Sequence, residues 1–105
     1  MNSAEQVTAT AAMLQRYFDE EVQGADYEGL RQWLTERLVY LLLHDMERLL
    51  SILYRIDVSE SKVKAAFAQQ DPRKIAPLLA GLILQREWQK AETRLKYKNQ
   101  NKDYF

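Results

Sequence analysis

The feature that most constrains this fold is the stretch at residues 38–56, LVYLLLHDMERLLSILYRI, which is the most apolar part of the chain and is interrupted by Asp45. Apolar residues from Leu30 onward recur at helical spacing, and this pattern continues onto position 45. An unbroken helix over residues 26–56 would be about 45 Å long. A compact domain of this size has a radius of gyration of only about 13 Å, so an unbroken helix would overhang its own core.

We favour a break near His44. Asp45 would then be the N-cap of a new helix, accepting from the backbone amide of Glu47 or Arg48. The alternative is an unbroken or bent helix in which Asp45 is buried. After a break, the following apolar residues form a new inward stripe, which consists of Met46, Leu49, Leu50, Leu53 and Ile56.

A second polar residue, Arg86, lies on the inward line of the last helix through Leu79 and Leu82. A buried charge without a partner is costly, so the two inward lines together predict a buried contact between Asp45 and Arg86. The predicted buried polar cluster consists of His44, Asp45, Arg86 and Gln89. We interpret this cluster as structural. The alternative, functional interpretation is a small polar pocket that binds an anion through Arg86.

Helix-capping signals divide the rest of the chain. The first helix should begin after Ser3, with Gln6 completing a capping box, and should end at Gly24. Its predicted apolar face comprises Val7, Ala11, Leu14, Phe18 and Val22. Asp26 should cap the second helix. Gly29, in its first turn, should weaken that start.

The second half of the chain should contain a short helix over about residues 60–69 that buries Val63, Ala66 and Phe67. Asp71 and Pro72 have the pattern of an N-cap followed by a first helical residue. Pro77 either kinks the resulting helix or starts the last one. That last helix should run to about Lys98, with residues 99–105 as a frayed tail.

These signals predict an all-α fold. Only three glycines and two prolines interrupt the 105 residues, and no alternating strand pattern is visible. A chain of this length buries roughly two-thirds of its unfolded surface. We therefore expect one compact domain, residues 1–105, formed by four to six helices with a long C-terminal helix that partly projects from the bundle.

The composition excludes several chemistries. The chain has no cysteine and one histidine, His44, so it has no thiolate, no cysteine-ligated metal and no triad or metal-binding sequence motif. We predict no catalytic residue, metal or cofactor, and hence no enzyme. The longest apolar run has six residues, against about 18 for a membrane span, and no signal peptide is visible. We expect a cytoplasmic protein.

Charge is distributed unevenly although its sum is zero. Residues 1–36 carry seven acids and two bases, and residues 86–105 carry six bases and three acids. We expect the acidic and basic faces to attract each other within a bundle or a dimer. Nucleic-acid binding is disfavoured because Glu87, Glu92 and Asp103 lie among the C-terminal bases.

The second half of the C-terminal helix is mostly charged but keeps one line of apolar residues. A helix that projects from the bundle would not need such a line unless it packs against a partner. We therefore predict an interface, such as that of a homodimer, at Leu84, Trp88, Ala91, Leu95 and Tyr97. Aromatic and arginine residues, which are enriched at interfaces, also occur at Tyr54, Arg55, Tyr104 and Phe105.

The expected function is a non-enzymatic protein–protein interaction or self-association module. One alternative is a nucleic-acid-binding protein that resembles a helix-turn-helix, with Asp45–Gln69 as two helices around a turn and Lys62 and Lys64 on the second. The other is a small-ligand-binding protein with a polar pocket near Asp45 and Arg86.

Three sequence segments, YRIDV (Tyr54 to Val58), LxxDMERLL before it and QRExQKAETR (Gln85 to Arg94), resemble small all-helical bacterial proteins of unassigned activity. The resemblance covers about residues 30–98 and excludes the first helix. It implies a compact helical domain and no particular mechanism.

Overall fold

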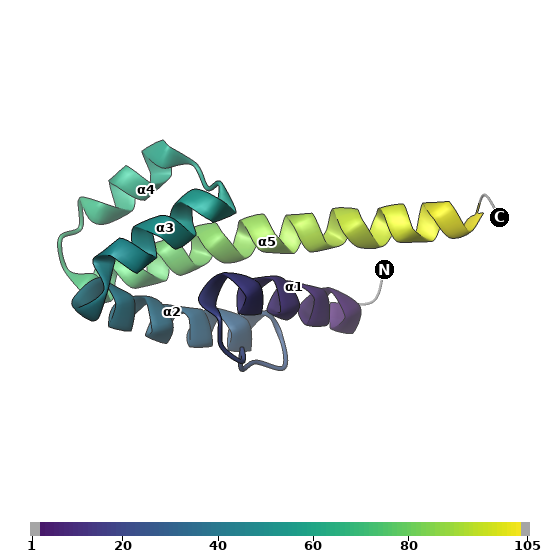
Figure 1. Cartoon of the computed structure of the whole chain (residues 1–105), viewed down its shortest axis with the longest axis horizontal. Helices are drawn as coiled ribbons and strands as arrows, with labels where there is room; N and C mark the ends of the chain where they lie inside the picture. Colours follow the sequence, from purple (N-terminus) through teal and green to yellow (C-terminus); the bar gives the residue numbers. More distant parts are fainter. Residues whose placement is uncertain (1–2, 104–105) are drawn as a thin grey trace.

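The structure, a computed structural model, describes residues 3–103 and the side chains of residues 4–98. Within this range it consists of five helices and has no strand, so the predicted all-α fold is confirmed. The helices are α1 (Ser3–Phe18), α2 (Tyr27–His44), α3 (Met46–Ile56), α4 (Glu60–Phe67) and α5 (Pro72–Asp103) (Figure 1).

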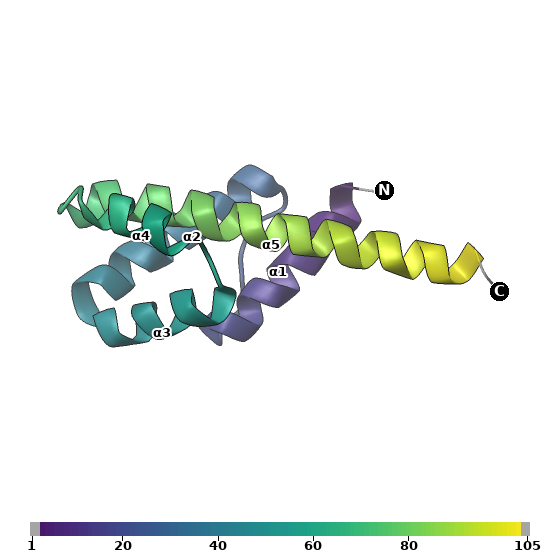
Figure 2. The ribbon, with the colours of Figure 1, turned by 90° about the horizontal axis from the view of Figure 1, so that it is seen from above.

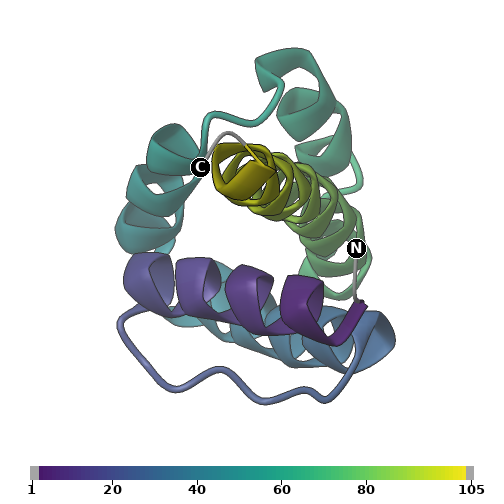
Figure 3. The ribbon, with the colours of Figure 1, turned by 90° about the vertical axis from the view of Figure 1, so that its right-hand side faces the viewer.

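Helix α5 is the element against which the other helices pack. It contacts α2 most extensively and also contacts α1, α3 and α4. Viewed from the end, it has α1 and α2 below it, α3 on its left and α4 above it (Figure 3). Its first half belongs to the core, where Leu79, Ile83 and Leu84 are fully buried. Its C-terminal end continues beyond the other helices (Figure 1), so the partial projection is confirmed.

Pro77 lies within α5 and does not start a separate helix. The helix begins as predicted, with the Asp71 carboxylate accepting from the amide of Arg73 at 2.9 Å. It then continues through Pro77 to Asp103, past the expected end near Lys98. Proline donates no backbone hydrogen bond, so one carbonyl in the preceding turn loses its helical partner. The neighbouring buried residues Ile75, Ala76, Leu79 and Ala80 pack into the core and hold the helix together at this point.

The predicted helix break at Asp45 is confirmed. The amide of Asp45 donates to the Leu41 carbonyl at 2.8 Å and so extends the hydrogen bonding of α2 by one residue. Its carboxylate accepts from the amide of Arg48 at 3.1 Å, which caps α3. One residue therefore ends α2 and begins α3, and the two helices diverge from it as the arms of a V (Figure 2).

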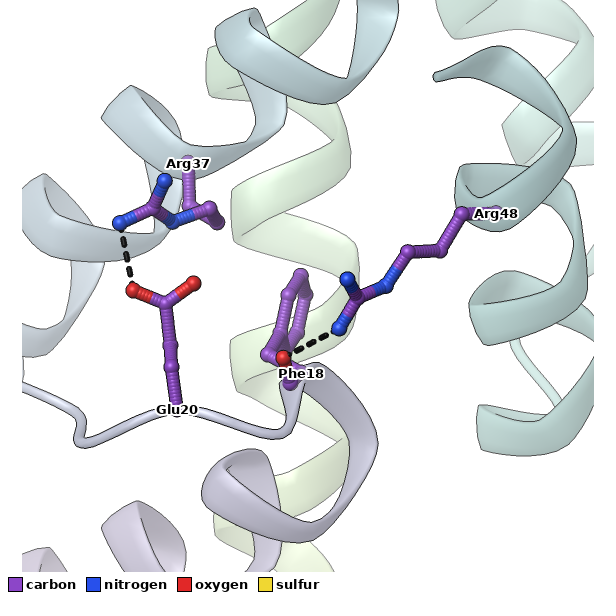
Figure 4. A network of polar contacts seen from close by, with 4 residues as sticks. All are labelled: Phe18, Glu20, Arg37 and Arg48. Atoms are coloured by element: carbon purple, nitrogen blue, oxygen red, sulfur yellow. Dashed lines mark hydrogen bonds and ion pairs between the residues drawn. The ribbon is translucent and has the colours of Figure 1, made fainter.

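The predicted end of the first helix is wrong, because α1 stops at Phe18 and not near Gly24. Asp19 takes a left-handed conformation (φ 53°), which ends a helix. The Phe18 carbonyl at this end accepts a hydrogen bond from the Arg48 guanidinium of α3, and Glu20 just beyond forms an ion pair with Arg37 of α2 (Figure 4). Side chains from two later helices thus fix where α1 ends.

Gly24 has a different role from the one predicted. It lies in the loop with φ +150°, a conformation that only glycine adopts readily. A Cβ atom there would lie 2.6 Å from the amide nitrogen of Leu30. Gly24 therefore lets the loop pass directly against the first turn of α2, which Asp26 caps as predicted by accepting from the Gly29 amide at 2.8 Å.

A few polar side chains lie within the otherwise apolar core, and we call them the polar seam. Among the described residues, the buried polar side chains are Gln6 and Thr10 of α1 and Glu87 of α5. The Gln6 amide donates to the Trp88 carbonyl at 3.1 Å. The ammonium of Lys90 donates to Glu87 Oε1 at 3.1 Å and to the Ile56 carbonyl at 3.1 Å, which links α5 to the end of α3. Thr10 Oγ1 and Glu87 Oε2 have no hydrogen-bond partner among the described residues.

Candidate interaction surface on helix α3

The predicted buried polar cluster does not form. Asp45 is exposed and its carboxylate caps α3. His44 is also exposed, with its ring 4.7 Å from the Tyr40 ring. Arg86 is half-buried and Gln89 is exposed, and these two residues line one cleft between α5 and the start of α4. The prediction fails because the helix breaks before Asp45, which removes it from the inward line of α2.

The predicted interface on α5 is largely part of the core of this chain. Leu84 and Ala91 are fully buried. Trp88 is half-buried, and its ring meets the Tyr27 ring edge-on, with 5.0 Å between centroids. Leu95 is half-buried and Tyr97 is exposed. Helices α1 and α2 cover this part of α5, which explains why its apolar line is needed. Leu84 and Ala91 therefore belong to the core and not to the predicted interface. Tyr104 and Phe105 lie outside the described residues.

Three of the seven large apolar side chains that are exposed in the described part of the chain lie on the outer face of α3; the other four are Tyr40, Leu43, Leu78 and Tyr97. The inward face of this helix buries Leu49, Ile52, Leu53 and Ile56. Met46, Leu50 and Tyr54, which are four residues apart, form a second apolar row that points outward, with exposed fractions of 41, 51 and 89%. The expected burial of Met46 and Leu50 is therefore wrong. We call this row, with the neighbouring row Glu47–Ser51–Arg55, the α3 outer face.

An apolar groove borders the α3 outer face. It has a volume of about 620 Å³ and lies between α3 and α4, which follow each other in the chain and stand apart in the end view (Figure 3). Its walls are mainly apolar, with Asp57 and Glu60 as its charged residues; the apolar lining consists of Leu50, Leu53, Tyr54, Val58 and Val63. Of the three residues expected to be buried by α4, only Ala66 is, whereas Val63 and Phe67 are half-buried.

Helix α3 is anchored on both its inner and lateral sides. Its arginine Arg48 donates to the Phe18 carbonyl of α1, and the guanidinium of Arg55 lies 5.3 Å from the Tyr17 ring centroid. At its C-terminus, the Ile56 carbonyl accepts from Lys90. The outer face therefore belongs to a fixed helix and does not become buried by a small rearrangement of α3.

Sequence periodicity contains a signal for this surface. Helix α3 has seven apolar residues among eleven, which is more than one helix face can bury against a single neighbour. Spacing alone did not separate the two rows, even with the helix starting at Met46. Met46 and Leu50 fit the same predicted stripe as Leu49, Leu53 and Ile56.

A second feature is the cleft at Arg86. It has a volume of about 220 Å³, and its polar lining includes Ser59, Lys62, Gln85 and Gln89. Neither Arg86 nor Lys62 forms an ion pair or hydrogen bond with the residues the structure describes. Two cations without partners thus share one cleft.

Other site types find little support in residues 3–103. No three or more histidine or acidic side chains there are grouped so that they could hold a metal ion. No helix in this range has the length and apolarity needed to cross a membrane.

Comparisons of the chain with protein-family models, with curated proteins and with solved structures find no match. The resemblance of residues 30–98 to small helical bacterial proteins therefore stays a prediction.

Proposed function

We propose that this protein is a non-enzymatic protein-binding module and that its binding surface is the α3 outer face with the adjoining groove. The observation that carries the proposal is the continuous row of Met46, Leu50 and Tyr54, which stays exposed although α3 is anchored on its other sides. Contiguous exposed apolar surface next to a groove is typical of sites that bind another protein.

The surface specifies the chemistry of its partner. An apolar helical ridge fits beside the row of α3, because rows of residues four apart pack into the grooves of a second helix. Glu47 lies near the start of α3 and Arg55 near its end. Both are exposed, and Arg55 lies at the edge of the outer face toward α1, where its guanidinium is 5.3 Å from the Tyr17 ring centroid. The partner helix should therefore present a base opposite Glu47 and an acid opposite Arg55.

The replacement Leu50→Glu tests this proposal. A charge in the centre of an apolar contact remains without a partner when it is desolvated. The tagged wild-type chain should capture partner proteins from a lysate, including an untagged second copy. We expect the tagged Leu50→Glu variant to lose them. The measurement is quantitative mass spectrometry of the captured proteins.

Leu78→Glu is the matched control. Leu78 is also on a helix, is exposed to a similar extent (47%), and lies outside the α3 outer face. We expect this variant to retain the captured proteins. If the two variants capture the same set as the wild type, or lose the same set, the α3 outer face is not the binding surface.

A second candidate function is binding of a small phosphate-containing anion in the Arg86 cleft, supported by the two cations without partners, Arg86 and Lys62. Because hydrogen bonds to charged groups contribute about 1.5–3 kcal/mol, Arg86→Gln should lower the affinity for inorganic pyrophosphate by about tenfold or more. Isothermal titration calorimetry measures this affinity, and Arg73→Gln, at the exposed start of α5, is the control. Absence of heat with the wild-type protein at millimolar pyrophosphate would eliminate this candidate.

A further inference from the structure

We infer that the α3 outer face binds the α3 outer face of a second copy of this chain, with the two helices antiparallel. The inference rests on the proposed function, because it names the occupant of the same surface. It moves the expected self-association from α5, where Leu84 and Ala91 are buried, to α3.

The residues of the outer face are arranged so that they match their own copy. Both rows have a residue at every fourth position, and each is centred on the middle of α3: Met46–Leu50–Tyr54 on Leu50, and Glu47–Ser51–Arg55 on Ser51. A two-fold axis passing near these central residues reverses the order of each row. It places Met46 opposite Tyr54 of the second copy, and Tyr54 opposite Met46 of the second copy. Contacts between a thioether and an aromatic ring are favourable.

The centre of this arrangement is compatible with close helix packing. Leu50 is the middle residue of the apolar row, and the small side chain of Ser51 beside it leaves a gap between the larger residues at either end. A leucine from the second copy fits this gap when rows of residues four apart interdigitate. The groove between α3 and α4 adds space for the methionine of the second copy beside Tyr54 and Val63.

The charges decide between the possible directions. In the antiparallel arrangement Glu47 faces Arg55 of the second copy, and the symmetry produces this opposite-charge contact twice. In a parallel arrangement the two-fold axis would run along the helices and would place the charged row of one copy beside the apolar row of the other, so that neither Glu47 nor Arg55 would face an opposite charge. Desolvating these charges without a partner disfavours that arrangement.

The size of the surface sets the expected strength. Helix α3 has 11 residues and is about 16 Å long, whereas stable interfaces bury about 1,200–2,000 Å² in total. The α3 outer face alone is short for such an interface, and the groove has to contribute. We therefore expect a reversible dimer whose fraction rises with concentration.

The test is a charge exchange between Glu47 and Arg55, followed by sedimentation equilibrium. Each single variant, Glu47→Arg or Arg55→Glu, places like charges opposite each other twice in its homodimer. We expect dimerisation of each single variant to weaken by about tenfold or more. An equimolar mixture of the two should dimerise to within about threefold of the wild type, because both contacts in the mixed dimer join opposite charges. The double variant in one chain should also recover.

A cross-link provides an independent test that does not depend on the charged variants. The chain has no cysteine, so Leu50→Cys introduces one thiol per copy close to the proposed axis. Disulfide formation requires Cα atoms within about 7 Å. Under mild oxidation we expect a disulfide-linked dimer of twice 12.4 kDa from Leu50→Cys, whereas Leu78→Cys should stay largely unlinked.

The outcomes separate this inference from the proposed function. A wild-type chain that remains monomeric at millimolar concentration overturns the inference, and so does a dimer that the mixture of single variants does not restore. In either case a partner that is lost with Leu50→Glu and kept with Leu78→Glu still supports the protein-binding function. Circular dichroism of each variant verifies that the helices are intact.

Discussion

Lys90→Met is expected to lower the free energy of unfolding by about 3–5 kcal/mol, because it leaves the fully buried carboxylate of Glu87 without its cation. The ammonium of Lys90 is the hydrogen-bond donor to Glu87 Oε1, and Glu87 Oε2 has no partner among the described residues. The same replacement also removes the bond to the Ile56 carbonyl. Urea denaturation followed by circular dichroism measures the change.

Replacing the other member of this ion pair should affect stability differently. Glu87→Met removes the buried charge itself and leaves Lys90 partly exposed and still bonded to Ile56, so stability should be unchanged or increased, because apolar replacement of buried ionic groups is often neutral or stabilising. Lys96→Met is the control: its ion pair with Glu92 is exposed, and its loss should cost less than about 1 kcal/mol. Equal effects of Lys90→Met and Lys96→Met would contradict our interpretation of the buried pair.

Gly24→Ala should destabilise the protein by about 2–6 kcal/mol. The left-handed backbone conformation costs a non-glycine residue about 1–3 kcal/mol. The new Cβ atom, 2.6 Å from the Leu30 amide nitrogen and 2.8 Å from the Gly29 carbonyl carbon, forces a shift in a packed segment, which costs about 1–3 kcal/mol more. Thermal and urea denaturation should both show the loss.

Gly81→Ala is the matched comparison for Gly24→Ala. Gly81 lies inside α5, and the nearest atom to a Cβ there is an Arg31 nitrogen at 3.9 Å, so a methyl group fits. Because alanine is the better helix former, this variant should gain about 0.5–1 kcal/mol. A destabilised Gly81→Ala, or a neutral Gly24→Ala, would contradict the account of the two glycines.

Local signals in the sequence predicted the features that depend on neighbouring residues. Asp26, Asp45 and Asp71 each cap the helix that follows, as their positions before helical patterns predicted. The existence of a break also followed from length, because an unbroken helix would have overhung the core, and the capping aspartate gave its position. Each of these caps depends only on a backbone amide two or three residues later in the chain.

Features that depend on distant residues were not predictable in this way. The end of α1 at Phe18 involves Arg48, thirty residues later. The burial of Leu84 and Ala91 depends on the place at which the N-terminal half of the chain packs on α5. No periodicity within a single segment contains that information.

The exposed row on α3 was missed for a related reason. Its sequence allows Leu50 to belong to either of two helix faces, and periodicity favours whichever stripe is longer. The choice is made by the orientation of α3 against α5 and α1, which the bonds from Lys90 and Arg48 stabilise. The candidate site could therefore be located from the structure, whereas the sequence indicated only that α3 has more apolar residues than one helix face can bury.

The polar seam described above determines how α1 is aligned along α5. A purely apolar helix pair can slide by one turn at little cost, since one leucine can replace another in the contact. Gln6 cannot slide in this way, because its amide would leave the Trp88 carbonyl and become a buried donor without an acceptor. The N-terminal helix thus has one longitudinal position, even though two polar atoms of the seam reduce its contribution to stability.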